Sequence, residues 1–327
     1  MILVTGATGF VGSALVRALI TNGETVRVLA RPGSDRRNLA GQKVEVVEGD
    51  LLNPASLAAA VKECRGLYHV AADYRLWARD PDKMFEANVN GSEAIVRAAM
   101  DARIERIVYT SSVATLGIVN GGVADEETPV SYADMIGVYK QSKYRAEEVV
   151  QRLIDKEGAP VVIVNPSTPI GPRDIKPTPT GRMIVEAAAG RMPAFVDTGL
   201  NIAHVDDVAA GHIQAFHKGQ VGQRYVLGGT DMTLSQILAH IAHKTGRKPP
   251  TIKIPHNAIL PIAYVAEAWT RLTGGDTPFV VVDGVRMAKK KMYFSSAKAA
   301  RDLGYTSRPA EQALDDAIRW FQAEGYL

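Results

Sequence analysis

The sequence predicts an α/β fold, in which a doubly wound parallel sheet carries a smaller, mainly helical lobe in the carboxyl-terminal half. Short apolar segments of strand length alternate with amphipathic helical segments up to about residue 165. The first of them, residues 2–4, has no polar side chain, as expected of a strand covered on both faces. Beyond residue 166 the alternation stops and helical periodicity dominates. These observations indicate two lobes of different architecture.

The elements of the large sheet are expected in a regular order. Strands are expected at residues 2–4, 25–29, 44–47, 66–70, 106–110, 160–164 and 225–227. Helices are expected from residue 11 to the stop at Gly23 and at residues 54–61, 88–100 and 139–153. Five prolines from Pro166 to Pro179 predict irregular structure. Later helices are expected at residues 234–245, 259–272, 296–303 and 309–321.

Residues 6–12 form a glycine-rich turn between the first expected strand and helix. Gly6 can take the backbone angles of a sharp turn, Gly9 lets a pyrophosphate approach the backbone, and Gly12 lets the helix lie close to the sheet. The amino end of the helix offers free N–H groups to phosphates. An ordinary tight turn is the alternative. The pattern favours a Rossmann-like dinucleotide site, with contacts from Gly6, Thr8, Gly9, Phe10, Val11 and Gly12.

The end of the second strand distinguishes between two nicotinamide cofactors. A carboxylate there would bind the ribose hydroxyls of NAD, but the sequence has Arg31, with Ser34 and Arg36 close behind. These side chains offer cations and a hydroxyl to a 2′-phosphate. A solvated basic loop is the alternative. NADP is therefore expected as the cofactor in preference to NAD.

Two further segments are expected to contact the cofactor. Asp50 could accept a hydrogen bond from an adenine amino group while Leu51 packs on the ring; alternatively, Asp50 caps the following helix. Ala71 and Ala72 follow the fourth strand, where small residues leave room for the ribose and phosphates.

Composition limits the classes of partner and location. The net charge of +3 is too small to indicate nucleic acid or an acidic membrane as a partner, and a small molecule is the expected substrate. Cys64 is the single cysteine and is expected to be a buried apolar residue, which fits a reducing, cytoplasmic compartment. The longest apolar stretch, residues 258–268, is too short for a membrane span, and no export signal is expected.

Ser112, Tyr139 and Lys143 make chemical sense together beside a nicotinamide. Ser112 follows the fifth strand, at the sheet edge where ligands bind. Tyr139 and Lys143 are four residues apart, hence on one face of a helix. An ammonium near the phenol, together with an oxidised nicotinamide, would lower the pKa of Tyr139 and suit it to acid–base catalysis. Lys143 could also bind the nicotinamide ribose. The three residues are therefore predicted to be catalytic, and no metal is required.

By these residues the chain resembles the extended short-chain dehydrogenase/reductases, also called the NAD-dependent epimerase/dehydratase family. The similarity spans the whole chain and includes, besides the glycine turn, Asp50, Leu51, Ala71, Ala72, Asn88, Thr110, Ser112, Tyr139, Lys143, Pro166, Ser167 and residues 204–208. Segments 74–81 and 165–174 are similar to those of hopanoid-associated sugar epimerases, which are relatives of dihydroflavonol 4-reductases.

The resemblance implies further roles and an assembly. It implies cofactor contacts at Asn88, Thr110 and Pro166, and a place for Ser167 near the nicotinamide. It also implies a homodimer built on helices that begin near Asn88 and Tyr139. Residues 1–165, with 202–226 returning to them, are the expected dinucleotide-binding domain. Residues 166–201 and 227–327 are the expected substrate lobe.

Two departures from better-known members narrow the activity. Val113 and Ala114 follow Ser112, where sugar dehydratases have an Asp-Glu pair, so dehydration is not expected. Leu116 stands where many nucleotide-sugar epimerases have a tyrosine, which argues against a UDP-galactose activity.

Three functional hypotheses remain. An NADP-dependent sugar epimerase, acting on a free or nucleotide-linked sugar by transient hydride transfer, is favoured by the resemblance. A ketone reductase of the dihydroflavonol 4-reductase type is the first alternative. A non-catalytic NADP-sensing protein is the second, and the presence of Tyr139 and Lys143 argues against it.

Four other segments have two interpretations each. The aromatic and basic residues 74–81 either line a substrate site or pack on the sheet. His204, Asp206 and Asp207 are expected to bridge the lobes rather than hold a metal. Lysines 289–291 either meet a diphosphate or form a solvated face. The apolar helix at residues 259–269 is expected to be lobe core rather than a membrane-facing patch.

Overall fold

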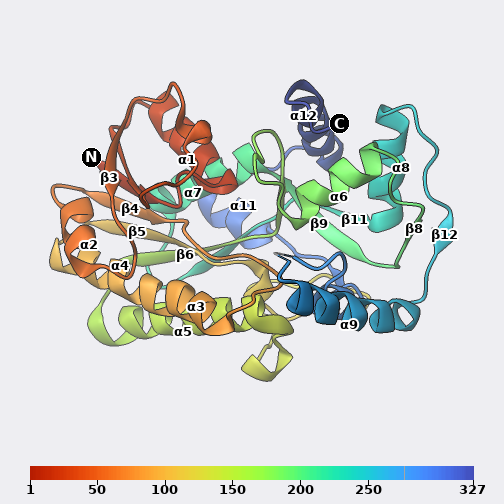
Figure 1. The fold of residues 1–327 in the computed structure, drawn as a ribbon. Helices are drawn as coiled ribbons and strands as arrows, with labels where there is room; N and C mark the ends of the chain where they lie inside the picture. The colour runs from red at the N-terminus through yellow and green to blue at the C-terminus, as the bar shows by residue number, and fades with distance from the viewer. Residues whose placement is uncertain (276) are drawn as a thin grey trace.

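The computed structural model describes residues 1–275 and 277–327, and its largest element is a seven-stranded sheet (Figure 1). The strand order is β10-β6-β5-β4-β1-β2-β3, and every neighbouring pair is parallel. The strands are β1 (Ile2–Thr5), β2 (Val26–Ala30), β3 (Val44–Glu48), β4 (Gly66–His69), β5 (Arg106–Thr110), β6 (Val161–Pro166) and β10 (Arg224–Leu227). The predicted doubly wound parallel sheet is confirmed.

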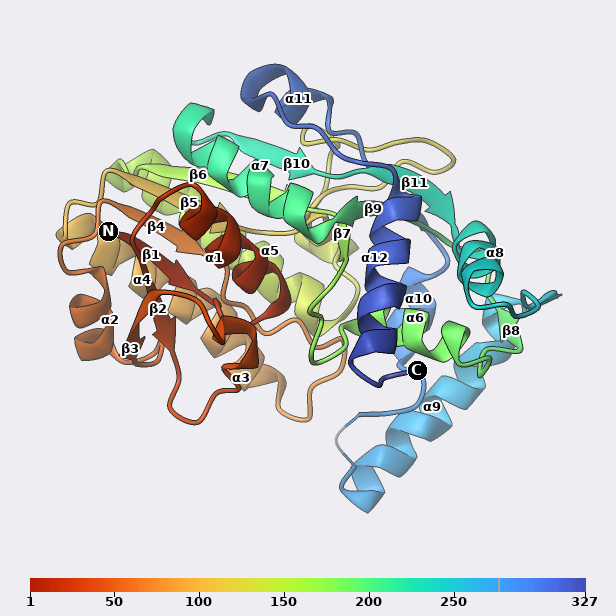
Figure 2. The same cartoon turned by 90° about the horizontal axis from the view of Figure 1, so that it is seen from above.

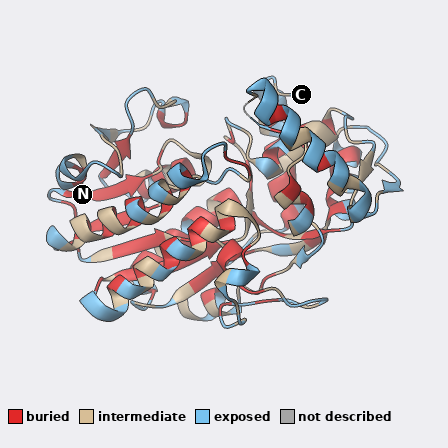
Figure 3. Ribbon diagram, turned by 60° about the horizontal axis from the view of Figure 1, so that its bottom comes forward, coloured by how far each residue is buried: buried red, intermediate tan, exposed pale blue. Residues whose placement is uncertain are grey.

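Helices cover both faces of this sheet (Figure 2). One face carries α1 (Phe10–Thr21) and α7 (Val205–Lys218), which pack on each other. The other carries α2 (Pro54–Val61), α4 (Gly91–Asp101) and α5 (Gly137–Glu157). Most residues of the sheet are buried, apart from those of the edge strand β3, and the outer faces of the helices are exposed (Figure 3).

The surroundings of strand β1 explain why apolar and polar residues do not alternate in its sequence. Ile2 and Val4 belong to the apolar cluster beneath α1 and α7, whereas Leu3 belongs to the cluster beneath α2, α4 and α5. Successive side chains of a strand point to opposite faces, so a sheet covered on both sides buries every one of them. The strand order reverses at β1, and its carboxyl end therefore opens into the crevice where ligands of such sheets bind.

The carboxyl-terminal part contains two small sheets besides its helices. One joins β7 (Thr168–Ile170), β9 (Gly199–His204), β11 (Thr230–Thr233) and β13 (Lys291–Met292); the other pairs β8 (Ala194–Phe195) with β12 (Ile252–Lys253). Helices α6 (Pro179–Ala188), α8 (Leu234–Lys244) and α12 (Ala310–Ala323) share one apolar cluster.

The irregular structure predicted from Pro166 to Pro179 is confirmed for residues 171–178 and is wrong at both ends. Pro166 is the last residue of β6, Pro169 lies within the short strand β7, and Pro179 is the first residue of α6. A proline at the first helical position lacks only an N–H that would have no partner inside the helix. Three of the five prolines therefore belong to strands or helices, whereas Pro172 and Pro177 lie in the irregular residues 171–178.

The last helices are α9 (His256–Thr273), α10 (Val282–Met287) and α11 (Ala297–Leu303). The expectation that residues 259–269 form lobe core is wrong, because only Ala263 and Thr270 of α9 are buried. The side of α9 that packs on α10 carries a small residue, Ala263, whereas several large apolar side chains point elsewhere. Among the described residues, no helix has the length and apolar composition that a membrane crossing requires.

Candidate active site

The glycine turn joins the carboxyl end of β1 to α1 and leaves no space for side chains. Gly6 has a φ of 70°, and a Cβ atom there would lie 2.6 Å from the backbone nitrogen of Ala71. A Cβ atom on Gly12 would overlap the carbonyl oxygen of Gly6. Helix α1 begins after Gly9 without a side-chain cap and without an acidic residue in its first turn. Its first N–H groups are thus available to a phosphate, so the residues present fit a dinucleotide.

Asn38 fixes this turn from outside and was missed by sequence reasoning. Its side-chain nitrogen, Nδ2, donates to the carbonyl oxygen of Thr8 at 3.3 Å and to that of Arg173 at 3.2 Å. Asn38 is 1% exposed and lies in the short 3-10 helix Arg37–Leu39 between β2 and β3. It therefore ties the glycine turn to the segment that follows β7.

The basic residues after β2 have different partners. Arg31 is exposed and makes no ion pair with any residue that the structure describes. The Ser34 hydroxyl donates to the Arg31 carbonyl oxygen at 2.8 Å. Arg36 pairs with Glu48 at 2.5 Å, which also neutralises the carboxylate at the end of β3. Arg31 is consequently the cation most available to a ligand here.

Asp50 follows β3 and does not cap α2. Its Oδ1 atom accepts from the backbone N–H of Leu52 at 2.9 Å. The N-cap is Asn53, whose Oδ1 accepts from the N–H groups of Ala55 and Ser56. Asn53 directly precedes Pro54, the first helical residue, and is therefore placed to cap it. Leu51 lies against α4, because a Cβ atom on Gly91 would sit 3.0 Å from the Leu51 side chain.

Asn88 holds the loop after β4. Its Oδ1 accepts from the N–H of Asp73 at 2.7 Å, and its Nδ2 donates to the Asp73 carbonyl oxygen and to the Ser142 hydroxyl, both at 2.9 Å. Both amide hydrogens are thereby used. Asn88 lies in a π-helical turn, Glu86–Asn90, between α3 (Pro81–Phe85) and α4. The backbone of Ala71 and Ala72 borders the same loop, and the N–H of Ala71 donates to Thr5 Oγ1 at 3.3 Å.

Segment 74–81 is a loop as far as Asp80, which caps α3. Tyr74 is exposed, whereas Trp77 and Ala78 are buried. The indole nitrogen of Trp77 is buried without a hydrogen-bond partner among the described residues. The segment is therefore partly buried, at Trp77 and Ala78, and partly exposed, at Tyr74.

Ser112, Tyr139 and Lys143 come together where β5 ends and α5 begins. Ser112 accepts from the N–H of Ala114 at 3.1 Å, which fixes the start of the short helix Val113–Thr115. Lys143 is 3% exposed, and its Nζ donates to the carbonyl oxygen of Thr110 at 2.8 Å. Helix α5 thus presents Tyr139 and Lys143 one turn apart beside the end of β5.

The pKa values show the electrostatic state of these groups. Burial raises the pKa of Tyr139, and the nearby Ser112 hydroxyl acts in the opposite direction. Burial lowers the pKa of Lys143 to about 8, while Glu147 opposes that change. The Lys143 ammonium is directed to the Thr110 carbonyl oxygen, and its effect on the Tyr139 phenol beside a bound nicotinamide stays a prediction.

Glu147 is the second residue that sequence reasoning missed. It is 5% exposed, and its Oε2 accepts from the hydroxyls of Ser111 and Thr115 and from the side-chain nitrogen of Asn165 at 3.2 Å. Its Oε1 lies 3.2 Å from Arg224 Nη2. Glu147 therefore joins α5 to the ends of β5 and β6 and to β10. The available signal was its spacing of four residues from Lys143.

Pro166 and Ser167 lie where β6 leaves the sheet. The N–H of Ser167 donates to the Leu227 carbonyl oxygen at 3.2 Å. Its hydroxyl is buried without a hydrogen-bond partner among the described residues. A buried polar atom without a partner is costly, so a ligand group at this point would satisfy it.

His204 and Asp207 contact the carboxyl-terminal segment, as the sequence predicted, whereas Asp206 pairs with Arg17 of α1 at 3.6 Å. His204 Nε2 lies 3.2 Å from Asp316 Oδ2 on α12, and Arg308 pairs with Asp207 at 2.7 Å. Cys64 is buried as predicted, and burial raises the pKa of its thiol. Within residues 1–275 and 277–327, no three side chains are grouped as metal ligands.

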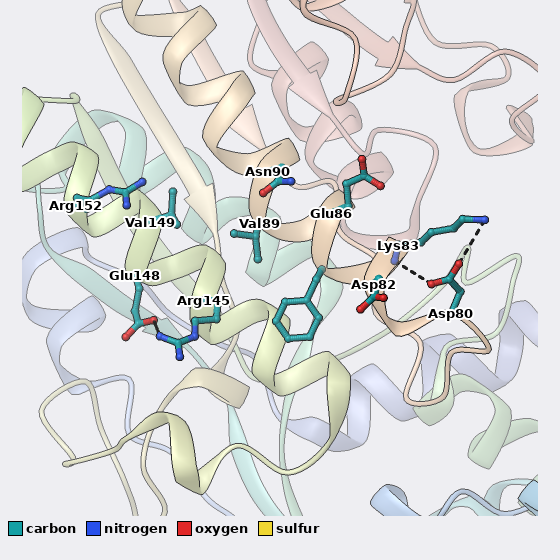
Figure 4. A pocket seen from close by; sticks show the side chains of 11 residues that line it. Asp80, Asp82, Lys83, Glu86, Val89, Asn90, Arg145, Glu148, Val149 and Arg152 are labelled. Carbon is teal, nitrogen blue, oxygen red and sulfur yellow. Dashed lines mark hydrogen bonds and ion pairs between the residues drawn. The ribbon is translucent and has the colours of Figure 1, made fainter.

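A groove of about 940 Å³ lies away from these residues, between α3, the π-helical turn and α5 (Figure 4). Its lining includes Val89 and Val149, flanked by charged side chains such as the Arg145–Glu148 pair at 2.8 Å. None of the predicted catalytic or cofactor residues lines it. The groove is therefore separate from the candidate active site.

Comparison with known proteins agrees with this geometry. The model of the NAD dependent epimerase/dehydratase family matches residues 2–228. The chain is 45% identical to a Synechocystis protein provisionally named dihydroflavonol 4-reductase, over 99% of this chain and 95% of that protein. It is 34% identical to sterol demethylase protein B of Methylococcus capsulatus, over 99% of each. The crystal structure of gox2253 is 51% identical with a TM-score of 0.90, covering 100% of this chain and 99% of that one.

The family match covers the glycine turn, the serine, the tyrosine–lysine pair and the strands that carry them. Members of this family are NAD(P)-dependent enzymes that act on small molecules. The chain belongs to the NAD-dependent epimerase/dehydratase family.

Proposed function

We propose that this chain is an NADP-dependent enzyme that interconverts a secondary hydroxyl group and a ketone of a small molecule. The observation that carries the proposal is the placement of Tyr139 and Lys143 on one face of α5, beside Ser112 at the end of β5. When bound, the nicotinamide would supply the hydride acceptor and donor.

Tyr139 is the proton-transfer group in this proposal. Ser112 would hold the substrate oxygen in line with the phenol, and Tyr139 would give or take its proton. Because burial raises the pKa of the phenol in the protein alone, the phenol is protonated at neutral pH, as reduction of a ketone requires. Lys143, fixed by the Thr110 carbonyl oxygen, would bind the nicotinamide ribose.

Net ketone reduction is the first candidate reaction. The 45% identical relative carries a reductase name and is matched over 95% of its length, which supports reduction more than the sugar epimerisation that the sequence resemblance favoured. Epimerisation is the second candidate, supported by the family whose model the chain matches. Tyr139 and Lys143 both argue against a purely sensing role.

Stoichiometry separates the two reactions. The purified protein would be incubated with NADPH and a panel of small ketones, including dihydroflavonols, and separately with nucleotide sugars and NADP. Reduction predicts one NADPH oxidised for each product molecule. An epimerase would form product without a net change in NADPH absorbance. Loss of product formation in Tyr139→Phe is expected in either case, and a wild-type rate in this variant would contradict the proposed site.

The preference for NADP rests on Arg31. One charge-assisted contact with the 2′-phosphate contributes ~1.5–3 kcal/mol, roughly ten- to a hundredfold in affinity. Titration calorimetry should therefore show that Arg31→Asp weakens NADP binding by that factor and spares NAD. Arg37→Asp is the matched control, because Arg37 is already paired with Asp35 at 2.8 Å. Equal or tighter binding of NAD by the unaltered protein would overturn the assignment.

We also propose that two copies of the chain associate through α3, the π-helical turn and α5. The groove in Figure 4 lies between these elements, and its Val89 and Val149 are flanked by charged side chains, which fits an interface with an apolar centre and a polar rim. Light scattering should report twice the chain mass, and Val149→Asp should lower it to one chain. A single-chain mass for the unaltered protein would contradict the dimer.

A further inference from the structure

Helix α9 carries a stripe of exposed apolar side chains. Ile262, Val265, Trp269 and Leu272 are 56%, 69%, 67% and 85% exposed. They are spaced by three, four and three residues, which places them on one face of the helix. Figure 2 shows α9 reaching away from the rest of the molecule. This face is therefore large, apolar and without a partner among the described residues.

The stripe is free of acidic side chains because the one acidic residue of α9 turns inward. Glu267 Oε1 accepts from the backbone N–H of Val282 at 2.7 Å, at the start of α10. On the same inner side, Ala263 packs with Val282 and Val285. The helix thus has a packed side toward α10 and an apolar side toward solvent.

Cations lie to one side of the stripe. Arg271 is exposed on α9 itself. Arg286 Nη2 donates to the Tyr264 hydroxyl at 2.8 Å, and Lys289 Nζ donates to Asn257 Oδ1 at 2.9 Å, so both basic side chains lie alongside α9. Lys290 and Lys291 follow and are exposed. An apolar helical face with a tryptophan and basic borders matches the chemistry of an anionic lipid surface.

The far end of α9 adjoins the loop that follows β4. Arg79 Nη2 donates to the Gly275 carbonyl oxygen at 3.1 Å, two residues beyond the end of the helix. Phe279, in the same connection to α10, is 91% exposed. The connection from α9 to α10 therefore adds a further exposed apolar side chain close in sequence to the end of α9.

We propose that α9 docks on an anionic lipid bilayer, with Ile262, Val265, Trp269 and Leu272 inserted at the level of the headgroups. The helix lies along the surface, and Arg271, Arg286 and Lys289 face the lipid phosphates. This site is separate from the catalytic residues, so the proposal holds whichever carbonyl reaction the enzyme performs. The competing occupants of this face are a second copy of the chain and a protein partner. Neither of them predicts sedimentation with anionic vesicles.

Vesicle sedimentation tests the proposal on the full chain. Vesicles of phosphatidylcholine with one third phosphatidylglycerol should sediment the protein, and vesicles of phosphatidylcholine alone should sediment at least severalfold less. Trp269 fluorescence should shift to shorter wavelength on binding, because an exposed indole moves into a less polar environment. The double substitution Trp269→Ser and Leu272→Ser should lower sedimentation about tenfold or more.

Two controls keep the result interpretable. Val221→Ser alters another exposed apolar residue, 48% exposed on the loop after α7, and should leave sedimentation unchanged. Circular dichroism of the double variant should match that of the unaltered protein, since both residues are exposed. Absence of sedimentation with the anionic vesicles overturns the proposal. A double variant that still sediments fully also overturns it. So does a double variant whose only change is a halved particle mass in light scattering, because the stripe would then join two copies of the chain.

Discussion

The large sheet and the carboxyl-terminal part of the chain are assembled in different ways. In the large sheet most neighbouring strands are consecutive along the chain, and the exceptions are the pairs β1–β4 and β6–β10. In the smaller sheet, β9 pairs with β7, β11 and β13, which come from residues 168–170, 230–233 and 291–292. Local patterns therefore specify the first part, whereas distant pairings specify the second.

The difference extends to function. The proposed chemistry lies at the carboxyl edge of the large sheet, while the carboxyl-terminal part supplies supporting contacts and the exposed face of α9. Substitutions at the sheet edge should therefore change turnover most, and substitutions in the carboxyl-terminal part should change stability or docking.

Tyr139→Phe should have the largest effect on turnover. Removing a general acid–base group costs ~10²–10⁴-fold in rate. The variant should keep its fold and bind NADP as before, since the aromatic ring remains. Tyr144→Phe, on the same helix, is the control and should retain its rate. Steady-state kinetics with a calorimetric titration of NADP would measure both.

Glu147→Gln should have the next largest effect. The Glu147 charge raises the pKa of Lys143 against burial, so its removal should lower the Lys143 pKa further below about 8. Lys143 then loses its proton at lower pH, and the alkaline limb of the pH–rate profile should move to lower pH. Turnover should fall ~10–100-fold, because a charge-assisted contact is lost.

Glu148→Gln is the matched control for that variant. Glu148 is the next residue of α5, exposed and paired with Arg145 at 2.8 Å. It should leave the pH profile in place. A Glu147→Gln profile identical to that of the unaltered protein would show that Glu147 is structural only.

Asn38→Ala should act on cofactor binding more than on turnover. The substitution leaves the carbonyl oxygens of Thr8 and Arg173 without their shared donor, at a cost of ~1–3 kcal/mol. Affinity for NADP should fall about tenfold, as seen by calorimetry, with saturated turnover changed little. Unchanged affinity would mean that the glycine turn keeps its shape without this contact.

Asp174→Asn should change stability against pH without an effect on turnover. Burial raises the Asp174 pKa to about 6, although the carboxylate accepts from Thr178. Since the folded pKa lies above the unfolded one of 3.8, this group stabilises the fold below about pH 4, and that stability is lost as pH rises through 6. The loss amounts to ~3 kcal/mol.

Urea unfolding at pH 4.5 and pH 7 would measure this prediction. The asparagine variant should lack that part of the pH dependence, and its stability should change less between the two conditions. The same slope in both proteins would show that the Asp174 carboxyl titrates normally.

The success of sequence reasoning follows the same division. Strands such as β1 and β5 were predictable because a strand that is buried on both faces appears in the sequence as a continuous run of mainly apolar residues. The glycine turn and the tyrosine–lysine pair were predictable because each depends on residues close together in the sequence. The turn needs glycines where backbones approach closely, and the pair needs a spacing of four residues to share one helix face. Glu147 was not, since Glu147 and Glu148 are adjacent and only the fold decides which is buried.

The misjudged helix α9 has a different cause. An amphipathic pattern shows that a helix has an apolar face, but whether other elements cover that face depends on the tertiary structure. Likewise, Asn38 gains its role from Arg173, a residue far along the chain that no local pattern relates to it. The domain boundaries and the roles of the site residues stay predictions, as does the cytoplasmic location.

The π-helical turn at Glu86–Asn90 has a consequence for insertions and deletions in this segment. A π-turn holds about one residue more than an α-turn, and each helical residue rotates the chain by ~100°. A deletion of one residue here could be absorbed by a change to an α-turn, whereas the present residues in an unbroken α-helix would turn α3 by about that angle relative to α4. The Asn88 amide would then lose either Asp73 or Ser142, the two groups it now joins. The π-turn therefore sets the rotation of α3 relative to α4, with one residue more than an α-turn would hold.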